Sequence, residues 1–243
     1  MKFRETLLAI ILVLVIAICK SYPQNLEKRV DSARVQIDTI LSKTIKYKHY
    51  NVGEVIDVDS SIHNPGIEDG NISDPYGTLK QCYLFMAGVY DYTMAEEKCV
   101  IGIYKNHSII WISGVLPGSQ YYEFPIGDNG FQAVKDLNKM GKVDIAVYFS
   151  NGTNPPSEYY LWIFSWDGKK AKCINQLEKN GETSIASDGP FEIKDVDRDG
   201  IYDVISYSID NSTSEGFKVN VIYKWNGSIY TDEKPTEKNR SNK

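Results

Sequence analysis

Two features of this sequence recur with a spacing of roughly 60 residues, and this repeat constrains the fold more than any single segment does. The stretch VKDLNKMGKVDIAV (134–147) aligns with IKDVDRDGIYDVIS (193–206), and equivalent aspartates lie 59 residues apart. Runs of β-forming residues that end in a tight turn recur in step, because the turn residues Asn106, Asp167 and Asn226 are 61 and 59 residues apart. Two features that share one period indicate consecutive copies of one structural unit.

The runs and turns within this period are typical of antiparallel sheet. Asp167-Gly168 and Asn226-Gly227 are the Asx-Gly pairs that favour a two-residue hairpin turn. Val, Ile and Tyr, which are enriched in strands, dominate the runs around these turns. We therefore expect a mostly β fold of about three β-meander sheets, at roughly 80–140, 141–199 and 200–231.

The faces of two predicted strands indicate that the sheets stack. YYLWIFSW (159–166) is apolar on both faces, which predicts a strand that is covered on both sides. FKVNVIYKW (217–225) is apolar on one face, whereas the other carries Lys218, Asn220 and Lys224. The last sheet should therefore expose one face to solvent, as the terminal unit of a repeat array does.

The segments that flank the repeats have different patterns. Apolar residues in steps of three and four from Leu26 to Ile45 predict one amphipathic helix within 25–50, which either packs against the sheets or forms a stalk. Residues 51–79 are rich in Gly, Pro, Asp, Asn and Ser, which predicts a loop-rich linker before the repeat region at 80–231. Residues 232–243 have little to bury and should form a disordered tail.

The N-terminus is typical of an export signal. Lys2 and Arg4 precede thirteen apolar residues, Leu7–Cys19, and polar residues follow at once. This arrangement over 1–22 predicts a signal peptide, since the apolar run is short for a membrane span of about 20 residues. If the segment is not cleaved, it would anchor the chain in the membrane. We expect an extracellular or cell-surface location in either case.

The net charge and the cysteine content limit the partners and the disulfides that this chain can have. The net charge of −5 provides no basic face for nucleic acid, so we expect no nucleic-acid partner. Beyond Cys19 the chain has only Cys82, Cys99 and Cys173, which permit at most one internal disulfide. Cys82 and Cys99 are the most local pair.

The stretch DVDRDGIYD (195–203) has the composition of a cation-binding loop. Its acidic side chains converge only if the chain curls, and Gly200 permits the sharp bend. Ca²⁺ takes such an all-oxygen shell at roughly 2.3–2.6 Å per ligand. An EF-hand is excluded, because Ser206 replaces the bidentate Glu and the flanks read as strands. The alternative is a hydrated turn without metal. The predicted ligands are the carboxylates of Asp195, Asp197, Asp199 and Asp203 and the backbone carbonyl of Ile201.

The upstream copy of this loop is less complete. Asp136, Asn138 and Asp144 occupy equivalent positions, but Met140 replaces the third carboxylate. These three residues would bind a cation weakly, or the turn would keep its shape without an ion. Both outcomes stay open at the level of the sequence.

These two loops, their period and the strands that end in W-D-G or W-N-G resemble the FG-GAP/VCBS-type repeats of integrin-like β-propellers. The resemblance covers about 130–231 well, and 80–130 only through the hairpin pattern. It implies four-stranded, propeller-blade-like meanders and Ca²⁺ ligation by Asp195, Asp197, Asp199, Asp203 and the Ile201 carbonyl. Complete propellers of that family have around seven blades, whereas this chain has room for about three.

The sequence contains no GxSxG, HExxH or phosphate-binding glycine motif. We therefore expect an exported, non-catalytic, Ca²⁺-binding β-repeat module that binds a protein or glycan. One alternative is a hydrolase that uses acids among Glu123, Asp128 and Glu158. The other is a structural envelope protein that assembles through the helix at 25–45.

Overall fold

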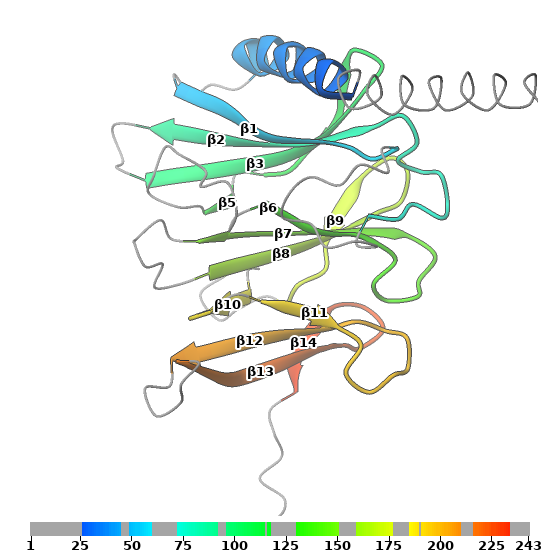
Figure 1. Cartoon of the computed structure of the whole chain (residues 1–243), viewed down its shortest axis with the longest axis vertical. Helices are drawn as coiled ribbons and strands as arrows, with labels where there is room; N and C mark the ends of the chain where they lie inside the picture. The colour runs from blue at the N-terminus through cyan, green and yellow to red at the C-terminus, as the bar shows by residue number, and fades with distance from the viewer. Residues whose placement is uncertain are drawn as a thin grey trace, which may run out of the picture.

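The computed structural model describes ten stretches of the chain, which are residues 26–44, 49–59, 72–91, 96–114, 116–117, 130–150, 159–176, 185–189, 191–209 and 216–233. Within these stretches the protein is mostly β, with three antiparallel sheets and a single N-terminal helix at 26–44. The predicted fold class is therefore confirmed. The predicted signal segment at 1–22 lies outside the described residues. Figure 1 shows the sheets one above another, with the helix over the first.

Sheets 1 and 2 each contain five strands. Sheet 1 has the order β1-β2-β3-β4, and β5 also pairs with β3. Sheet 2 has the order β10-β8-β7-β6, and β9 also pairs with β8. The strands of sheet 1 are β1 (His49–Asp57), β2 (Tyr83–Asp91), β3 (Glu96–Lys105), β4 (Ser108–Ile112) and β5 (Leu116–Pro117). Those of sheet 2 are β6 (Gly130–Lys135), β7 (Val143–Ser150), β8 (Tyr159–Trp166), β9 (Ala171–Cys173) and β10 (Ile185–Ser187).

Sheet 3 is a simple four-stranded meander in the order β11-β12-β13-β14. Its strands are β11 (Glu192–Lys194), β12 (Asp203–Ile209), β13 (Phe217–Trp225) and β14 (Tyr230–Glu233). The predicted hairpins join the third and fourth strands of the three sheets, but the two-residue turns predicted at Asp167-Gly168 and Asn226-Gly227 are wrong, because four residues (167–170 and 226–229) separate the paired strands there. Asp167 Oδ1 accepts the Lys169 and Lys170 backbone N–H groups, both at 2.9 Å, so the Asx side chain holds the turn.

The middle sheet is buried on both faces, as its sequence predicts. Trp162, Phe164 and Trp166 of β8 lie in one apolar cluster with residues of sheet 1. Leu161 and Ile163, the alternate residues of the same strand, lie in a second cluster with residues of sheet 3. Since successive side chains of a strand point to opposite faces, β8 connects the two cores.

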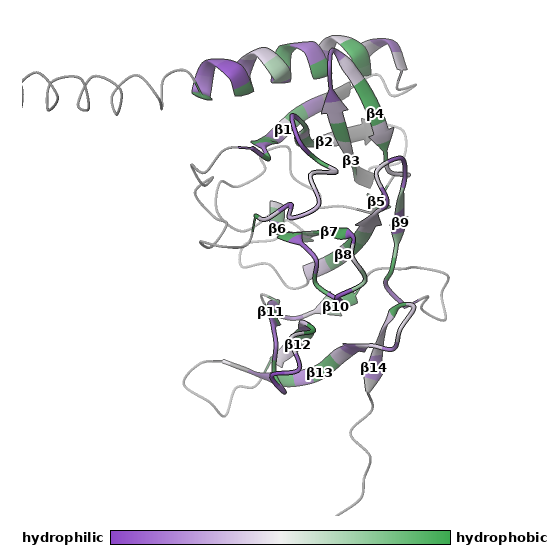
Figure 2. Cartoon of the chain, turned by 90° about the vertical axis from the view of Figure 1, so that its right-hand side faces the viewer, coloured by the Kyte–Doolittle hydropathy of each residue, from purple (hydrophilic) through white to green (hydrophobic). Residues whose placement is uncertain are grey.

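The outer faces of the two end sheets differ in their exposure to solvent. The outer face of sheet 3 carries exposed residues that include Lys218 and Asn220, as predicted for β13, but Val219 of the predicted apolar face is also 53% exposed. The outer face of sheet 1 is covered by the helix. Figure 2 shows the helix lying across this end from a second direction. A third cluster joins Ala33, Ile37 and Leu41 of the helix to sheet-1 residues that include Phe85 and Val100.

Several predicted boundaries are wrong. The helix ends at residue 44, and β1 begins at His49, so the predicted linker at 51–79 starts inside a strand. The sheets occupy 49–117, 130–187 and 192–233, and β14 extends into the tail predicted at 232–243. The period fixes the length of a unit but not where each unit begins. A register shift between Val52 and Val55 also breaks the alternation that would have indicated β1.

Cys82 and Cys99 are buried free thiols in the core between sheets 1 and 2, so the disulfide considered from the sequence does not form in this structure. Burial raises the pKa of the Cys82 thiol to about 11, which makes it a poor nucleophile near neutral pH. Within the described part of the chain, no helix combines the length and apolar character needed to cross a bilayer.

Candidate metal centre

Three equivalent loops connect the first two strands of the three sheets. In each loop the first residue is an aspartate whose Oδ2 accepts the backbone N–H of the sixth residue. These bonds measure 2.6 Å to Leu79, 3.0 Å to Gly141 and 2.9 Å to Gly200. We number the nine positions identically in loop 1 (74–82), loop 2 (136–144) and loop 3 (195–203).

Loop 1 begins within the predicted linker at 51–79 and ends beyond it, and it was not identified from the sequence. Position 4 has a positive φ in all three loops, at 66° for Gly77, 58° for Lys139 and 64° for Arg198. The available signal was spacing, because Asp74 precedes Asp136 by 62 residues, close to the 61-residue spacing of the hairpins. Loop 1 keeps an acidic residue only at position 1, so the motif itself was not visible.

The three loops contact one another in a column. The Tyr76 hydroxyl of loop 1 donates to Asp136 Oδ2 of loop 2 at 2.5 Å. Lys139 Nζ of loop 2 donates to the Asp199 carbonyl of loop 3, and the Tyr202 N–H donates to the Leu137 carbonyl at 2.8 Å. In Figure 1 the loops follow one another down the right-hand side.

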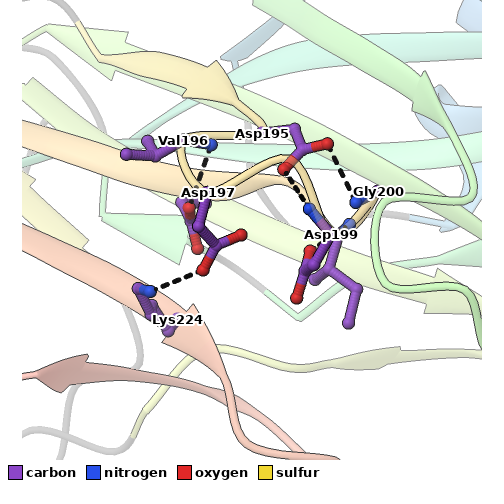
Figure 3. Close-up of polar contacts among 8 residues, drawn as sticks. Asp195, Val196, Asp197, Asp199, Gly200 and Lys224 are labelled. Atoms are coloured by element: carbon purple, nitrogen blue, oxygen red, sulfur yellow. Dashed lines mark hydrogen bonds and ion pairs between the residues drawn. The ribbon is translucent and has the colours of Figure 1, made fainter.

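Loop 3 brings three carboxylates together. Asp195, Asp197 and Asp199 each offer an oxygen, and these oxygens lie within 4.8 Å of one another. Asp195 Oδ1 accepts the Asp199 N–H at 3.1 Å, which curls the loop so that positions 1 and 5 approach. Figure 3 shows Asp195 turned toward the backbone nitrogens of Asp199 and Gly200. Among acidic, His and Cys side chains of the described residues, this is the group of three that meets the distance needed to share an ion.

The spacing of these oxygens fits a calcium ion. Two ligands at roughly 2.3–2.6 Å from one cation can lie no further apart than about 5 Å. The 4.8 Å limit met by the three carboxylates is within this range. All three donors are oxygen atoms, which suits a hard cation and does not favour zinc.

Two lysines already place positive charge beside this cluster. Lys224 Nζ of β13 lies 2.8 Å from Asp197 Oδ2, and this hydrogen bond lowers the pKa of the Asp197 carboxyl. The Lys139 side chain lies against Gly200, at a place that a Cβ of residue 200 would occupy. A cation in loop 3 would therefore share Asp197 with Lys224 or displace it.

The predicted ligand at position 9 lies apart from the other three carboxylates. Asp203 is buried at the start of β12, and its Oδ2 accepts the Val196 N–H at 3.2 Å. Desolvation raises the pKa of this carboxyl. Asp203 therefore closes the loop onto the strand, outside the converging group. The Ile201 N–H donates to Asp199 Oδ1 at 2.7 Å, and its carbonyl stays a predicted ligand.

Loop 2 has the same turn as loop 3, but its polar groups already form hydrogen bonds. Asp136 accepts hydrogen bonds from Tyr76, Met140 and Gly141. Asn138 is buried, and its Oδ1 accepts the Met140 N–H at 3.0 Å. Asp136 and Asn138 thus already accept backbone N–H groups of their own loop, and cation binding by Asp136, Asn138 and Asp144 stays a prediction.

Asp144, at position 9 of loop 2, is fully buried, and desolvation raises the pKa of its carboxyl to about 7. Its Oδ2 accepts the Leu137 N–H at 3.1 Å. Among the described residues, its Oδ1 and the Tyr230 hydroxyl are buried atoms without a hydrogen-bond partner. Burial raises the pKa of the Tyr230 hydroxyl, and the nearby Asp144 charge adds to this effect. Asp144, at position 9 of loop 2, is thus buried in the core, where desolvation disfavours the charged form of its carboxyl.

Comparisons with protein-family models, curated proteins and solved structures return no match. The three acids considered for a hydrolase, Glu123, Asp128 and Glu158, lie outside the described residues.

Proposed function

We propose that this chain is an exported, non-catalytic β-repeat module that binds Ca²⁺ in loop 3 and a protein or glycan partner at its surface. The observation that carries the proposal is the convergence of Asp195, Asp197 and Asp199. The resemblance of the Asp loops and hairpins to FG-GAP/VCBS-type repeats supports the same assignment. No second function is favoured by a specific observation on the described residues.

A bound calcium ion would supply positive charge to a loop with mutually repelling carboxylates. The protein's own residues already hold the backbone of this loop in shape. Asp195 holds the backbone of positions 5 and 6, and Asp203 fixes the N–H of position 2. A rigid loop 3 would also hold Lys139 and Leu137 of loop 2, because both contact loop 3 directly. Calcium binding would thus stiffen the column of loops along one side of the stack.

The exported location rests on the N-terminal pattern of Lys2, Arg4 and the apolar run Leu7–Cys19. We propose secretion or a cell-surface location, with membrane anchoring if the segment is retained. The helix at 26–44 buries its apolar face on sheet 1. Assembly through this helix, as the envelope alternative requires, would have to use its polar face.

Thermal unfolding of the full chain in Ca²⁺ and in chelator tests the metal assignment. Binding to the folded state alone contributes about 2.7 kcal/mol when the free ion is at 100 times its Kd, so the midpoint should rise by several degrees. Asp199→Asn should abolish this rise.

Asp167→Asn is the matched control for this experiment. It removes the same charge at a hairpin position where the other two units carry asparagine. This variant should keep the full calcium effect. Equal midpoints in Ca²⁺ and chelator for the unmodified chain would contradict the proposal, as would an unchanged rise in Asp199→Asn.

A further inference from the structure

A cavity of about 400 Å³ lies between the N-terminal helix and the first sheet. Ligand pockets typically occupy about 300–1,000 Å³, so this volume suits a small molecule. The lining combines amide, hydroxyl, imidazole and guanidinium groups with two tyrosines. It consists of Arg29, Ser32, Ala33, Gln36, Gln81, Tyr83, Tyr104, Asn106 and His107.

The three repeats provide an internal comparison for one of these residues. The second position of the hairpin turn is Gly168 in sheet 2 and Gly227 in sheet 3, with φ values of 91° and 95°. In sheet 1 the turn has only two residues, Asn106 and His107, against four in the other two sheets, and its second residue is His107, with φ at 63°. A two-residue turn with a positive φ at both positions is ordinary for a hairpin, and histidine, like asparagine, visits this region more often than most side chains. The His107 side chain lines the cavity.

Most of the described non-glycine residues with a positive φ line this cavity. Five residues other than glycine have a positive φ, and Gln81, Asn106 and His107 are three of them. The other two, Lys139 and Arg198, occupy position 4 of loops 2 and 3. Asparagine and histidine both tolerate this backbone region, so the strain lies at Gln81.

Gln36 of the helix fixes the polar groups at the centre of the cavity. Its Oε1 accepts the Tyr104 hydroxyl at 2.5 Å, and its Nε2 donates to Ser32 Oγ at 3.3 Å. The same Oε1 lies 2.5 Å from His107 Nδ1. Because a carbonyl oxygen only accepts, Nδ1 carries the proton, and Nε2 of the neutral ring becomes an acceptor for a ligand. The donors and acceptors are therefore preorganised.

The charge of the cavity does not favour an anion. Arg29 is its only formally charged side chain at neutral pH, and its guanidinium lies 2.8 Å from Asp57 Oδ2. The pair is close to neutral, while the amides of Gln81 and Asn106 offer both donors and acceptors. Tyr83 and Tyr104, with ring centroids 6.0 Å apart, add aromatic surface. Neutral sugars present vicinal hydroxyls and an apolar ring face, which match these groups.

We propose that this cavity is a binding site for a neutral sugar unit of a glycan. The proposal rests on the binding role proposed above and specifies its ligand, but it requires no calcium. His107 and Gln81 supply side-chain hydrogen bonds that glycine at the same positions would lack, and the helix forms one wall through Gln36.

Titration of the full chain with methyl glycosides of glucose, galactose, mannose and N-acetylglucosamine, followed by NMR, tests this site. At least one glycoside should saturate at millimolar concentration and shift the signals of Gln36, Gln81 and His107. His107→Gly and Gln81→Gly should each lower the affinity at least tenfold. Glycine adopts the positive φ of residues 81 and 107 without strain, so the melting midpoints of both variants should stay close to that of the unmodified chain. Ser228→Ala, in the sheet-3 hairpin, should bind as the unmodified chain does.

The proposal is overturned if no neutral glycoside shifts these signals, or if His107→Gly and Gln81→Gly bind as tightly as the unmodified chain. Exclusive binding of N-acetylneuraminic acid would also overturn it, since it would show an anion site. The calcium effect on melting is measured separately on the same samples. Loss of sugar binding with a retained calcium effect would reject this site alone, and the reverse result would reject the calcium assignment alone.

Discussion

At the scale of single residues, burial divides the loop aspartates into two kinds. Asp195, Asp197 and Asp199 lie at the surface, where water and lysine side chains offset their repulsion. Asp144 and Asp203 are buried at position 9 and hold the loop through backbone N–H groups. The first kind is suited to an ion that exchanges with solvent, whereas the second kind closes the loop onto the sheet.

The raised pKa of Asp144 predicts a pH dependence of stability. The folded state keeps this carboxyl protonated up to about pH 7, whereas in the unfolded chain it ionises near its ordinary pKa of about 4. The folded state therefore binds more protons in this window, and the free energy of unfolding falls as pH rises from about 4 to 7. Asp144→Asn should flatten this slope and raise the free energy of unfolding at pH 8 by about 1–3 kcal/mol.

Chemical denaturation at a series of pH values measures this slope. Asp167→Asn is again the control, because hydrogen bonds from the Lys170 and Lys169 backbone lower the pKa of Asp167 and place its titration below this window. A steeper slope or a loss of stability at pH 8 in Asp144→Asn would show that its carboxylate is stabilised by a contact instead of penalised by burial.

Lys224 predicts a second effect at the residue scale. Its ammonium group competes with a metal ion for Asp197. An exposed ion pair contributes little, so Lys224→Met should tighten calcium binding by no more than about fivefold. Lys218→Met, an exposed lysine of the same strand, should leave the affinity unchanged. Weaker binding in Lys224→Met would mean that the lysine supports the ion site.

At the scale of elements, the helix completes the stack by covering the outer face of sheet 1. Leu41 is fully buried in this contact, whereas Val35 on the opposite side is 66% exposed. Leu41→Ala should lower the free energy of unfolding by about 2–5 kcal/mol, because it removes apolar contacts and leaves a cavity. Val35→Ala should change it by less than about 0.5 kcal/mol. Urea denaturation measures both, and equal effects would contradict the packing of this helix.

Loop 2 allows a gain-of-function test of the calcium site that we propose for loop 3. Met140 is 54% exposed and occupies the position of Asp199. Met140→Asp restores the third carboxylate in a loop that already curls through Asp136. Calcium titration should then show a second, weaker site. Met140→Asn supplies a neutral oxygen at the same place and should bind less tightly, and the absence of any second site in Met140→Asp would indicate that Tyr76 and Lys139 prevent it.

At the scale of the whole molecule, the sequence predicts the repeated hairpins and the alternation of apolar and polar faces along the strands. The hairpins, the doubly buried β8 and the solvent face of β13 follow from Asx-Gly pairs and apolar patterns. The start of the first sheet does not follow, because the bulge near Val55 breaks the alternation of β1. Loop 1 was missed because only Asp74 of the acidic set remains.

The candidate site was only partly predictable. The convergence of Asp195, Asp197 and Asp199 was expected from their spacing and Gly200. The inward position of Asp203 depends on how β12 pairs with β11, which a loop motif does not encode. The lysines beside loop 3 come from loop 2 and β13, so their contribution arises only from the stacking and pairing of distant segments.

Isothermal titration calorimetry of the full chain with CaCl₂ tests most directly whether the acidic turn of loop 3 is a calcium site. We expect one ion per chain, with a Kd below about 1 mM, and loss of this binding in Asp199→Asn. No heat of binding in the unmodified chain, or the same single site in Asp199→Asn, would contradict this assignment.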